Sequence, residues 1–244
     1  MVRVNKQPVS YLQYDSRWGK NDYSAKGEKT TIGAAGCGPS CAAMLIETLT
    51  GKKFTPADAC AWSLKKGYKA LNQGTYYSYF VPQFKAFGIA CERLNTSNLY
   101  GNSSSPVHAK ALSMLKQGYY LIACMGKGLW TTSGHYIVVW WEDGKVRIND
   151  PGSTKTERLN GDLSKFKSQV KYYWAIDARE FNNKEDDDME YYKTINDVPT
   201  AYRPAIKKLV DNGALKGTGN ALNVSDDFCR TMTVLDRLGV LDKK

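Results

Sequence analysis

The spacing of hydrophobic and polar residues changes near the middle of the chain. In the N-terminal half, apolar residues recur at helical intervals: Cys41, Leu45 and Leu49 lie four residues apart, and Gly51 is placed to end that helix. A more extended pattern precedes this helix, at residues 9–18. Three more helices are expected in this half, each followed by a glycine, at residues 55–66, 79–87 and 105–117.

From residue 119 the pattern becomes that of β-strands. Apolar, aromatic and β-branched residues form four short runs, at residues 119–125, 135–141, 146–149 and 172–176. Asp143-Gly144 lies between the second and third runs, and this pair favours a tight hairpin turn. Helices followed by an antiparallel sheet predict an α+β fold.

A polar, acidic stretch at residues 182–188 has nothing to bury and is interpreted as a linker. It would separate a large domain at residues 1–181 from a small helical domain at residues 189–244. Two helices are expected in the small domain, at residues 199–212 and from the cap Ser225 to residue 238. Such a unit has only a small core of its own.

Net charge and the absence of certain sequence patterns indicate which partners to expect. The 244 residues carry a formal net charge of +10, which favours binding to polyanions such as an anionic cell wall. Basic blocks and nucleic-acid motifs are absent, so nucleic acid is not an expected partner. No run of about 18 apolar residues predicts a membrane span. Because no apolar signal-peptide core is present, we expect synthesis in the cytoplasm, with any export by another route.

The six cysteines are scattered through helix and strand patterns. They form no CxxC pairs or tight clusters, and this argues for reduced thiols and against a structural zinc site. Three disulfides are the alternative. The sequence indicates no metal site.

Cys37 is the candidate nucleophile. It lies where the glycine-rich turn Gly36-Cys37-Gly38 becomes a helix, and Pro39 suits the first turn of that helix. Unpaired N–H groups at a helix N-terminus favour thiolate over thiol, which makes a cysteine reactive. Cys41, one turn later, is expected to point into the core. A buried cysteine before an ordinary core helix would give the same local pattern.

The choice of a general base is narrow because the chain has two histidines. His135 begins the most apolar strand, at a sheet end where a cleft can open, and is the candidate base. A core histidine with satisfied hydrogen bonds is the alternative. His108 lies in the first turn of a predicted surface helix, where we expect a solvated side chain.

Asp150 is the candidate third member. It ends the next strand, one hairpin away from His135, where a carboxylate can fix the tautomer and orientation of the imidazole. Asn149 is the alternative third member, and an ordinary Asp-Pro-Gly turn would also account for Asp150.

Three segments carry a family resemblance, namely Gly36-Cys37-Gly38-Pro39-Ser40, Ser133-Gly134-His135-Tyr136-Ile137-Val138-Val139 and Asn149-Asp150-Pro151. In order and spacing they resemble the papain-like cysteine peptidases related to the bacteriocin leader (double-glycine) peptidases, over roughly residues 8–178. The resemblance implies a papain-like fold, with Cys37 as nucleophile, His135 as general base and Asp150 as the orienting residue. It also implies that Gln13 donates to the oxyanion. No metal or other cofactor is implied.

Residues 192–240 resemble one divergent copy of the surface-layer-homology type of cell-wall-binding repeat. The matching segments are Ile195-Asn196-Asp197-Val198-Pro199, Ala205-Ile206, Leu209-Val210, Gly213, Gly217 and Arg230-Thr231. That family usually works in three copies. A helical appendage used for packing or for homo-oligomerisation is the alternative.

Together, the two resemblances and the positive charge are similar to a phage-type endolysin or another bacterial cell-wall hydrolase. The expected substrate is an amide bond in the peptide part of peptidoglycan, cut at the cell wall. A protease that processes a protein or leader peptide is one alternative. A non-catalytic cell-wall-binding protein is another, although it would have no physical reason to retain Cys37, His135 and Asp150 together.

Overall fold

The computed structural model describes residues 7–160, 162–179, 191–217 and 221–242. The chain divides into two compact units, Met1–Asn182 and Asn183–Lys244. The predicted linker at residues 182–188 lies outside the described residues. Each unit is described separately below.

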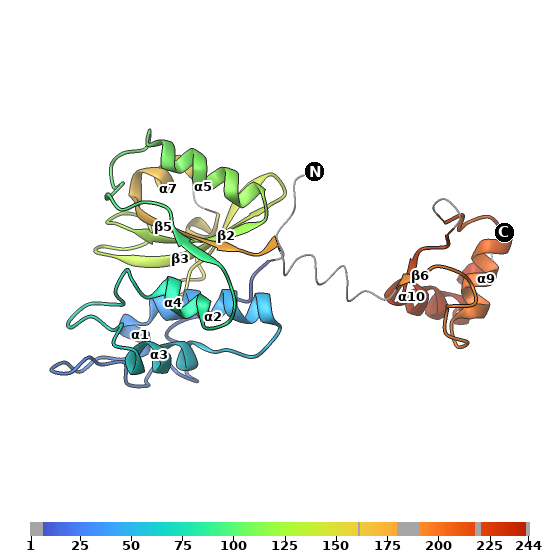
Figure 1. Cartoon of the computed structure of the whole chain (residues 1–244), viewed down its shortest axis with the longest axis horizontal. Coiled ribbons are helices and arrows are strands. Elements are labelled where there is room, and N and C mark those ends of the chain that lie inside the picture. The colour runs from blue at the N-terminus through green and yellow to red at the C-terminus, as the bar shows by residue number, and fades with distance from the viewer. Residues whose placement is uncertain (1–6, 161, 180–190, 218–220, 243–244) are drawn as a thin grey trace. The chain divides into compact units, whose positions relative to one another are not determined.

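A five-stranded antiparallel sheet forms the centre of the first unit, and its strand order is β1-β5-β2-β3-β4 (Figure 1). The strands are β1 (Cys91–Arg93), β2 (Tyr119–Met125), β3 (His135–Glu142), β4 (Lys145–Asn149) and β5 (Val170–Asp177). Asp143 and Gly144 connect β3 to β4 with φ values of 50° and 75°, the left-handed conformations that a tight hairpin turn requires. The sheet and its helices confirm the predicted α+β class.

Helices cover both faces of this sheet, with α5 and α7 on one side and α1 to α4 on the other (Figure 1). The helices are α1 (Ile32–Ala35), α2 (Cys37–Thr50), α3 (Pro56–Lys65), α4 (Phe80–Lys85), α5 (Pro106–Lys116), α6 (Thr156–Leu159) and α7 (Leu163–Gln169). The strand pattern explains the two cores. In β2, Tyr120 and Ile122 point towards the α2 side, whereas Leu121 and Ala123 point towards the α5 side.

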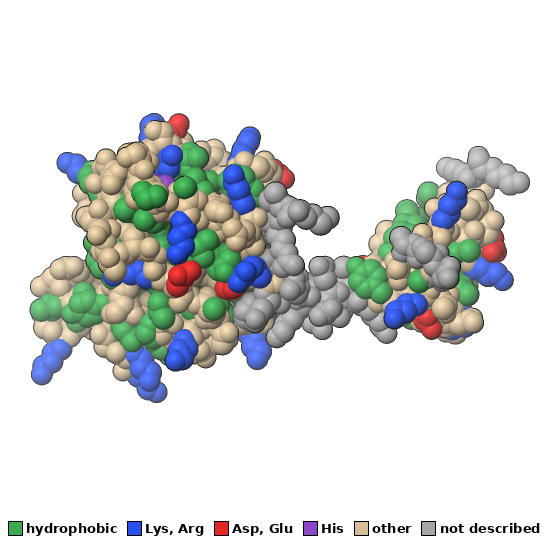
Figure 2. All heavy atoms as spheres, turned by 45° about the horizontal axis from the view of Figure 1, so that its top comes forward, with side chains coloured by type: hydrophobic (Ala, Val, Ile, Leu, Met, Phe, Trp, Pro, Cys, Tyr) green, Lys and Arg blue, Asp and Glu red, His purple; other side chains and the backbone are tan. Residues whose placement is uncertain are grey.

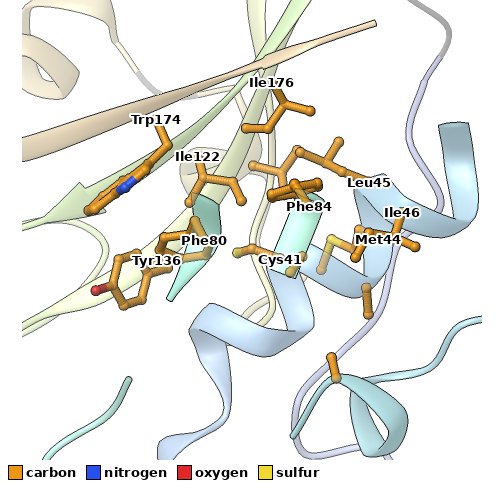
Figure 3. Packing of buried hydrophobic residues seen from close by; sticks show 14 of the residues in the cluster. Cys41, Met44, Leu45, Ile46, Phe80, Phe84, Ile122, Tyr136, Trp174 and Ile176 are labelled. Carbon is orange, nitrogen blue, oxygen red and sulfur yellow. The ribbon is translucent and has the colours of Figure 1, made fainter. Parts of the chain in front are cut away.

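Helix α2 is buried along most of its length, because the sheet covers one side of it and α3 and α4 cover others. Figure 3 shows Cys41 and Leu45 among side chains of α4 and the sheet. Phe80 of α4 packs against Trp174 with ring centroids 4.8 Å apart. Gly51 ends the helix in the left-handed conformation, as its sequence position predicts. This packing gives the N-terminus of α2 a fixed position beside the sheet.

Two expectations need correction, one about the conformation of a segment and one about the order of the elements. Residues 13–20 form consecutive turns rather than an extended segment, because backbone N–H groups of Trp18 and Gly19 bond to the carbonyl of Asp15. Helices also do not all precede the sheet: β1 comes before α5, and α6 and α7 lie between β4 and β5.

The second unit has its own small core. It contains the strand pair β6 (Tyr191–Tyr192) and β7 (Val224–Ser225), the helices α9 (Arg203–Asp211) and α10 (Asp226–Arg237), and the short η1 (Val240–Asp242). Ser225 caps α10 by accepting a hydrogen bond from the Phe228 N–H at 3.2 Å, as predicted. Ile206 and Cys229 are fully buried between the two helices and the strand pair.

Candidate active site

Cys37 is the first residue of α2, and both neighbouring glycines lie close to other groups of the chain. A Cβ on Gly36 would lie 2.6 Å from the Ile32 carbonyl oxygen, which closes the preceding helix. A Cβ on Gly38 would lie 3.2 Å from the Tyr136 ring. The glycines therefore let α2 begin tightly against α1 and approach β3 closely.

His135 begins β3, and Asp150 directly follows β4, so the hairpin places the two side chains together. His135 Nε2 and Asp150 Oδ1 are 2.6 Å apart. The same carboxylate oxygen accepts the Gly152 N–H at 2.7 Å. The side chain of Asn149, the alternative third member, donates to the Pro8 carbonyl oxygen at 3.1 Å instead. Of the two candidates, Asp150 is therefore the one whose side chain bonds to the imidazole.

The Cys37 thiol and the His135 ring line the same cleft, and hydrogen bonding and charge between them act on the pKa of both groups. Since Nε2 faces Asp150, Nδ1 is the ring nitrogen that faces the sulfur. Burial opposes ionisation of the thiol. The hydrogen bond and charge of His135, together with the N–H groups of Tyr136 and Gly38, outweigh it and hold the pKa of Cys37 below the ordinary thiol value.

The pKa of His135 changes in the opposite direction. Burial lowers it, but hydrogen bonds and charge from Asp150 and Cys37 raise it to about 9. A lowered pKa of the thiol beside a raised pKa of the imidazole favours the thiolate–imidazolium pair over the two neutral groups. Burial raises the pKa of each of the other thiols, namely Cys41, Cys60, Cys91, Cys124 and Cys229. Cys37 is therefore the only one of the six thiols whose surroundings favour the thiolate.

Gln13 forms two hydrogen bonds to residues near the candidate site in the sequence. Its backbone N–H donates to the Pro151 carbonyl oxygen at 2.8 Å, next to Asp150. Its side-chain amide donates to the Gly33 carbonyl oxygen at 2.7 Å, just before Cys37. An amide nitrogen carries two N–H groups, and this bond uses one of them.

Arg158 is a site residue that the sequence reasoning missed. It lies in the short helix α6, and its Nη2 is 2.6 Å from Asp150 Oδ2 as an ion pair. The same nitrogen donates to the Trp130 carbonyl oxygen, and the Trp130 indole donates back to the Arg158 carbonyl oxygen at 2.9 Å. The guanidinium thus holds the buried carboxylate from the side opposite His135. No local motif marks this arginine in the sequence.

A cleft of about 460 Å³ opens at the Cys37–His135 pair. One wall is the segment of residues 70–77, and the other contains residues 133–136. Cys124 and Lys171 contribute from the neighbouring strands β2 and β5. A peptide lying in this cleft would pass the sulfur.

A buried ion pair holds the first wall in place. Lys69 Nζ donates to Glu28 and to the carbonyl oxygens of Ala70 and Gln73, the latter two at 2.7 Å. Glu28 also accepts the Asn72 N–H at 2.6 Å. The hydrogen bond from Lys69 holds the pKa of Glu28 below its usual value. All three N–H groups of the Lys69 ammonium are therefore hydrogen-bonded, and these bonds hold the segment of residues 70–77 in place.

The expectation for His108 was wrong. This residue is 2% exposed rather than solvated. Its ring lies between the Tyr173 hydroxyl and the Asn102 carbonyl oxygen, each at 2.9 Å, because α5 packs against β5. Burial lowers the pKa of His108. Its role is structural, and it does not contact the cleft.

Within the described ranges, no cluster of three or more His, Cys, Asp and Glu side chains has an arrangement suited to a metal ion. None of the described helices combines the length and apolar composition that a bilayer span requires.

Comparison with known proteins gives one family match. The model of the Peptidase_C39 like family matches residues 12–180, which include Gln13, Cys37, His135 and Asp150. No curated protein matches the chain.

Proposed function

Because the chain belongs to the Peptidase_C39-like family and is therefore a cysteine peptidase, we propose that it cleaves an amide bond in the peptide part of peptidoglycan. The catalytic residues of this proposal are Cys37, His135 and Asp150. The observation that carries it is the grouping of three side chains: the Cys37 thiol lines the cleft together with the His135 ring, and Nε2 of that ring lies 2.6 Å from the Asp150 carboxylate. Cysteine at a helix N-terminus and histidine on an antiparallel sheet also support the papain-like assignment.

Attack on the substrate follows from the ionisation of the pair. The Cys37 thiolate adds to the carbonyl carbon, and the imidazolium of His135 then gives its proton to the leaving amine. The neutral imidazole next takes a proton from water, which attacks the thioester and releases the carboxylic acid. Asp150 keeps the ring in the orientation that both proton transfers need. The reaction needs no redox step.

The tetrahedral intermediate carries a negative oxygen that the site must stabilise. In our proposal the donors are the backbone N–H of Cys37 and the second N–H of the Gln13 amide. The Gly33 carbonyl oxygen holds the first amide N–H, which fixes the plane of the group. Such a fixed donor costs no reorganisation during the reaction.

Support for a cell-wall substrate comes from charge and from the second unit. The net charge of +10 favours approach to an anionic wall. Figure 2 shows Lys and Arg side chains spread over the visible face of each unit rather than gathered in one patch, as suits a diffuse polyanion. The resemblance of residues 192–240 to a surface-layer-homology repeat suggests attachment to wall polymer. The protein would then act as an endolysin-like enzyme at the wall.

The test uses purified Gram-positive walls and soluble muropeptides. The wild-type protein is expected to reduce wall turbidity, and mass spectrometry should show a new amine and carboxylate at one peptide position. Cys37→Ala should abolish both, whereas Cys124→Ala, which removes a second thiol from the cleft, should retain turnover. Unchanged lysis by Cys37→Ala would overturn the proposal.

Other outcomes point to the alternative functions. Cleavage of unstructured proteins or glycine-containing leader peptides, with intact walls, would indicate a processing protease. Wall binding without any turnover would indicate a non-catalytic binding protein. A chain that ends at Asn182 should still cleave soluble muropeptides but bind walls more weakly if the second unit attaches to wall polymer.

A further inference from the structure

Lys171 lies in the cleft beside the catalytic histidine. It is the second residue of β5, and it lines the same cavity as Cys37. Its Nζ lies 3.3 Å from the point that a Cβ on Gly134 would occupy. Because Gly134 directly precedes His135 and consecutive Cα atoms are about 3.8 Å apart, the ammonium group lies close to the backbone of His135 in the cleft that also contains the Cys37 thiol.

Among its described neighbours, this ammonium group has no carboxylate partner. None of the ion pairs found among the described residues includes Lys171. The residues that line the cleft include neither Asp nor Glu. Apart from Lys171, His135 and Cys37, the polar side chains of the lining are neutral amides, hydroxyls and the Cys124 thiol.

The charge balance of the cleft is therefore positive. The thiolate of Cys37 and the imidazolium of His135 offset each other, which leaves the charge of Lys171 uncompensated. A partly buried ammonium group without a counter-ion attracts an anionic ligand, and a charge-assisted hydrogen bond to a carboxylate is stronger than a neutral one.

We propose that the cleft selects peptides with a free carboxylate next to the scissile amide, and that Lys171 binds this carboxylate. The inference deepens the proposed function and rests on it for the substrate. Peptides of the wall would qualify where a side-chain or α-carboxylate is unmodified. The same peptides with that carboxylate amidated would bind poorly.

A pair of small alkylating agents tests the ammonium group without any assumption about the substrate. Iodoacetate and iodoacetamide form the same bond to Cys37, and both release iodide, but one carries a carboxylate and the other an amide. For the wild-type protein near neutral pH and at low salt, we expect the ratio of the two rates to favour iodoacetate. Lys171→Gln should lower that ratio about tenfold, as expected for loss of one charge-assisted hydrogen bond.

Two variants control this experiment. Lys171→Arg keeps the charge and should retain most of the preference for iodoacetate. Lys145→Gln removes the same charge from the exposed first residue of β4, and should leave the ratio unchanged. An equal ratio in wild type and Lys171→Gln, or an equal loss in Lys145→Gln, would overturn the inference.

An experiment with muropeptide substrates tests the role of Lys171 separately from the proposed function. With muropeptides that carry the carboxylate or its amide, Lys171→Gln should raise KM for the free acid about tenfold and leave kcat nearly unchanged. Equal cleavage of acid and amide by the wild type would refute the role of Lys171 while leaving wall hydrolysis intact. A preference for iodoacetate without cleavage of muropeptides would support the carboxylate-binding role of Lys171. It would also refute the proposal that peptidoglycan is the substrate.

Discussion

Replacement of Asp150 by Asn tests how the site ionises its nucleophile. The pKa of His135 is about 9 against an ordinary 6.5, a difference of about 3 kcal/mol in favour of the imidazolium. Among the contributions that raise this pKa, the hydrogen bond from Asp150 is the largest. An amide has the same shape but no charge. We therefore expect the pKa of His135 to fall and, with less positive charge beside it, the pKa of Cys37 to rise.

The expected size follows from the pKa of His135, which without the carboxylate should fall from about 9 towards the ordinary 6.5. The alkaline limb of the pH profile, where His135 loses its proton, should therefore move down by as much as about two pH units. Iodoacetamide alkylation of Cys37 and kcat/KM, measured between about pH 4 and 10, should show this shift together with an acid limb that moves to higher pH. On the alkaline side, wild-type turnover should decline above about pH 9, because His135 loses the proton that the leaving amine needs.

The matched control is Asp143→Asn, the same change at the exposed turn of the same hairpin. It should leave both limbs in place. Since Asp150 also pairs with Arg158, thermal unfolding is used to confirm that the Asn variant is folded at the assay temperature. An acid limb at the same pH in wild type and Asp150→Asn would refute the reasoning.

Two further predictions concern the support of the site. Arg158→Met leaves Asp150 buried without its cationic partner at 2.6 Å, and should cost about 3 kcal/mol or more in urea unfolding. Arg147→Met removes a more exposed pair and should cost less than about 1 kcal/mol; equal costs would contradict the buried role. His108→Gln weakens the contact with Tyr173 and should lower the thermal midpoint without changing Cys37 alkylation, whereas a changed alkylation rate would connect His108 to the active site.

Local sequence signals were sufficient where chain neighbours determine the structure. Spacing and the left-handed Gly51 fixed the C-terminus of α2, and the Asp143-Gly144 pair marked the β3–β4 hairpin. The candidate residues Cys37 and His135 could be chosen because the chain has few histidines and one cysteine at a glycine-flanked helix start. That both side chains line one cleft is a property of the fold that the sequence could only suggest.

The features that the sequence did not reveal depend on contacts between distant residues. Arg158 reaches Asp150 from a four-residue helix whose sequence has no distinguishing pattern. His108 is buried because Tyr173, 65 residues later, supplies a partner for its ring. Lys171 looks like an ordinary strand lysine until β5 is placed beside the cleft. Burial of this kind follows from tertiary packing rather than from hydrophobic periodicity.

The most direct test of the central claim is the pH dependence of Cys37 alkylation, read by peptide mass spectrometry across all six cysteines. With limiting iodoacetamide at about pH 6, roughly two units below an ordinary thiol, we expect label on Cys37 alone. The His135→Gln variant should lose that label and regain it only at alkaline pH. Labelling of several cysteines at equal rates, or an unchanged profile in His135→Gln, would contradict a thiolate held by His135.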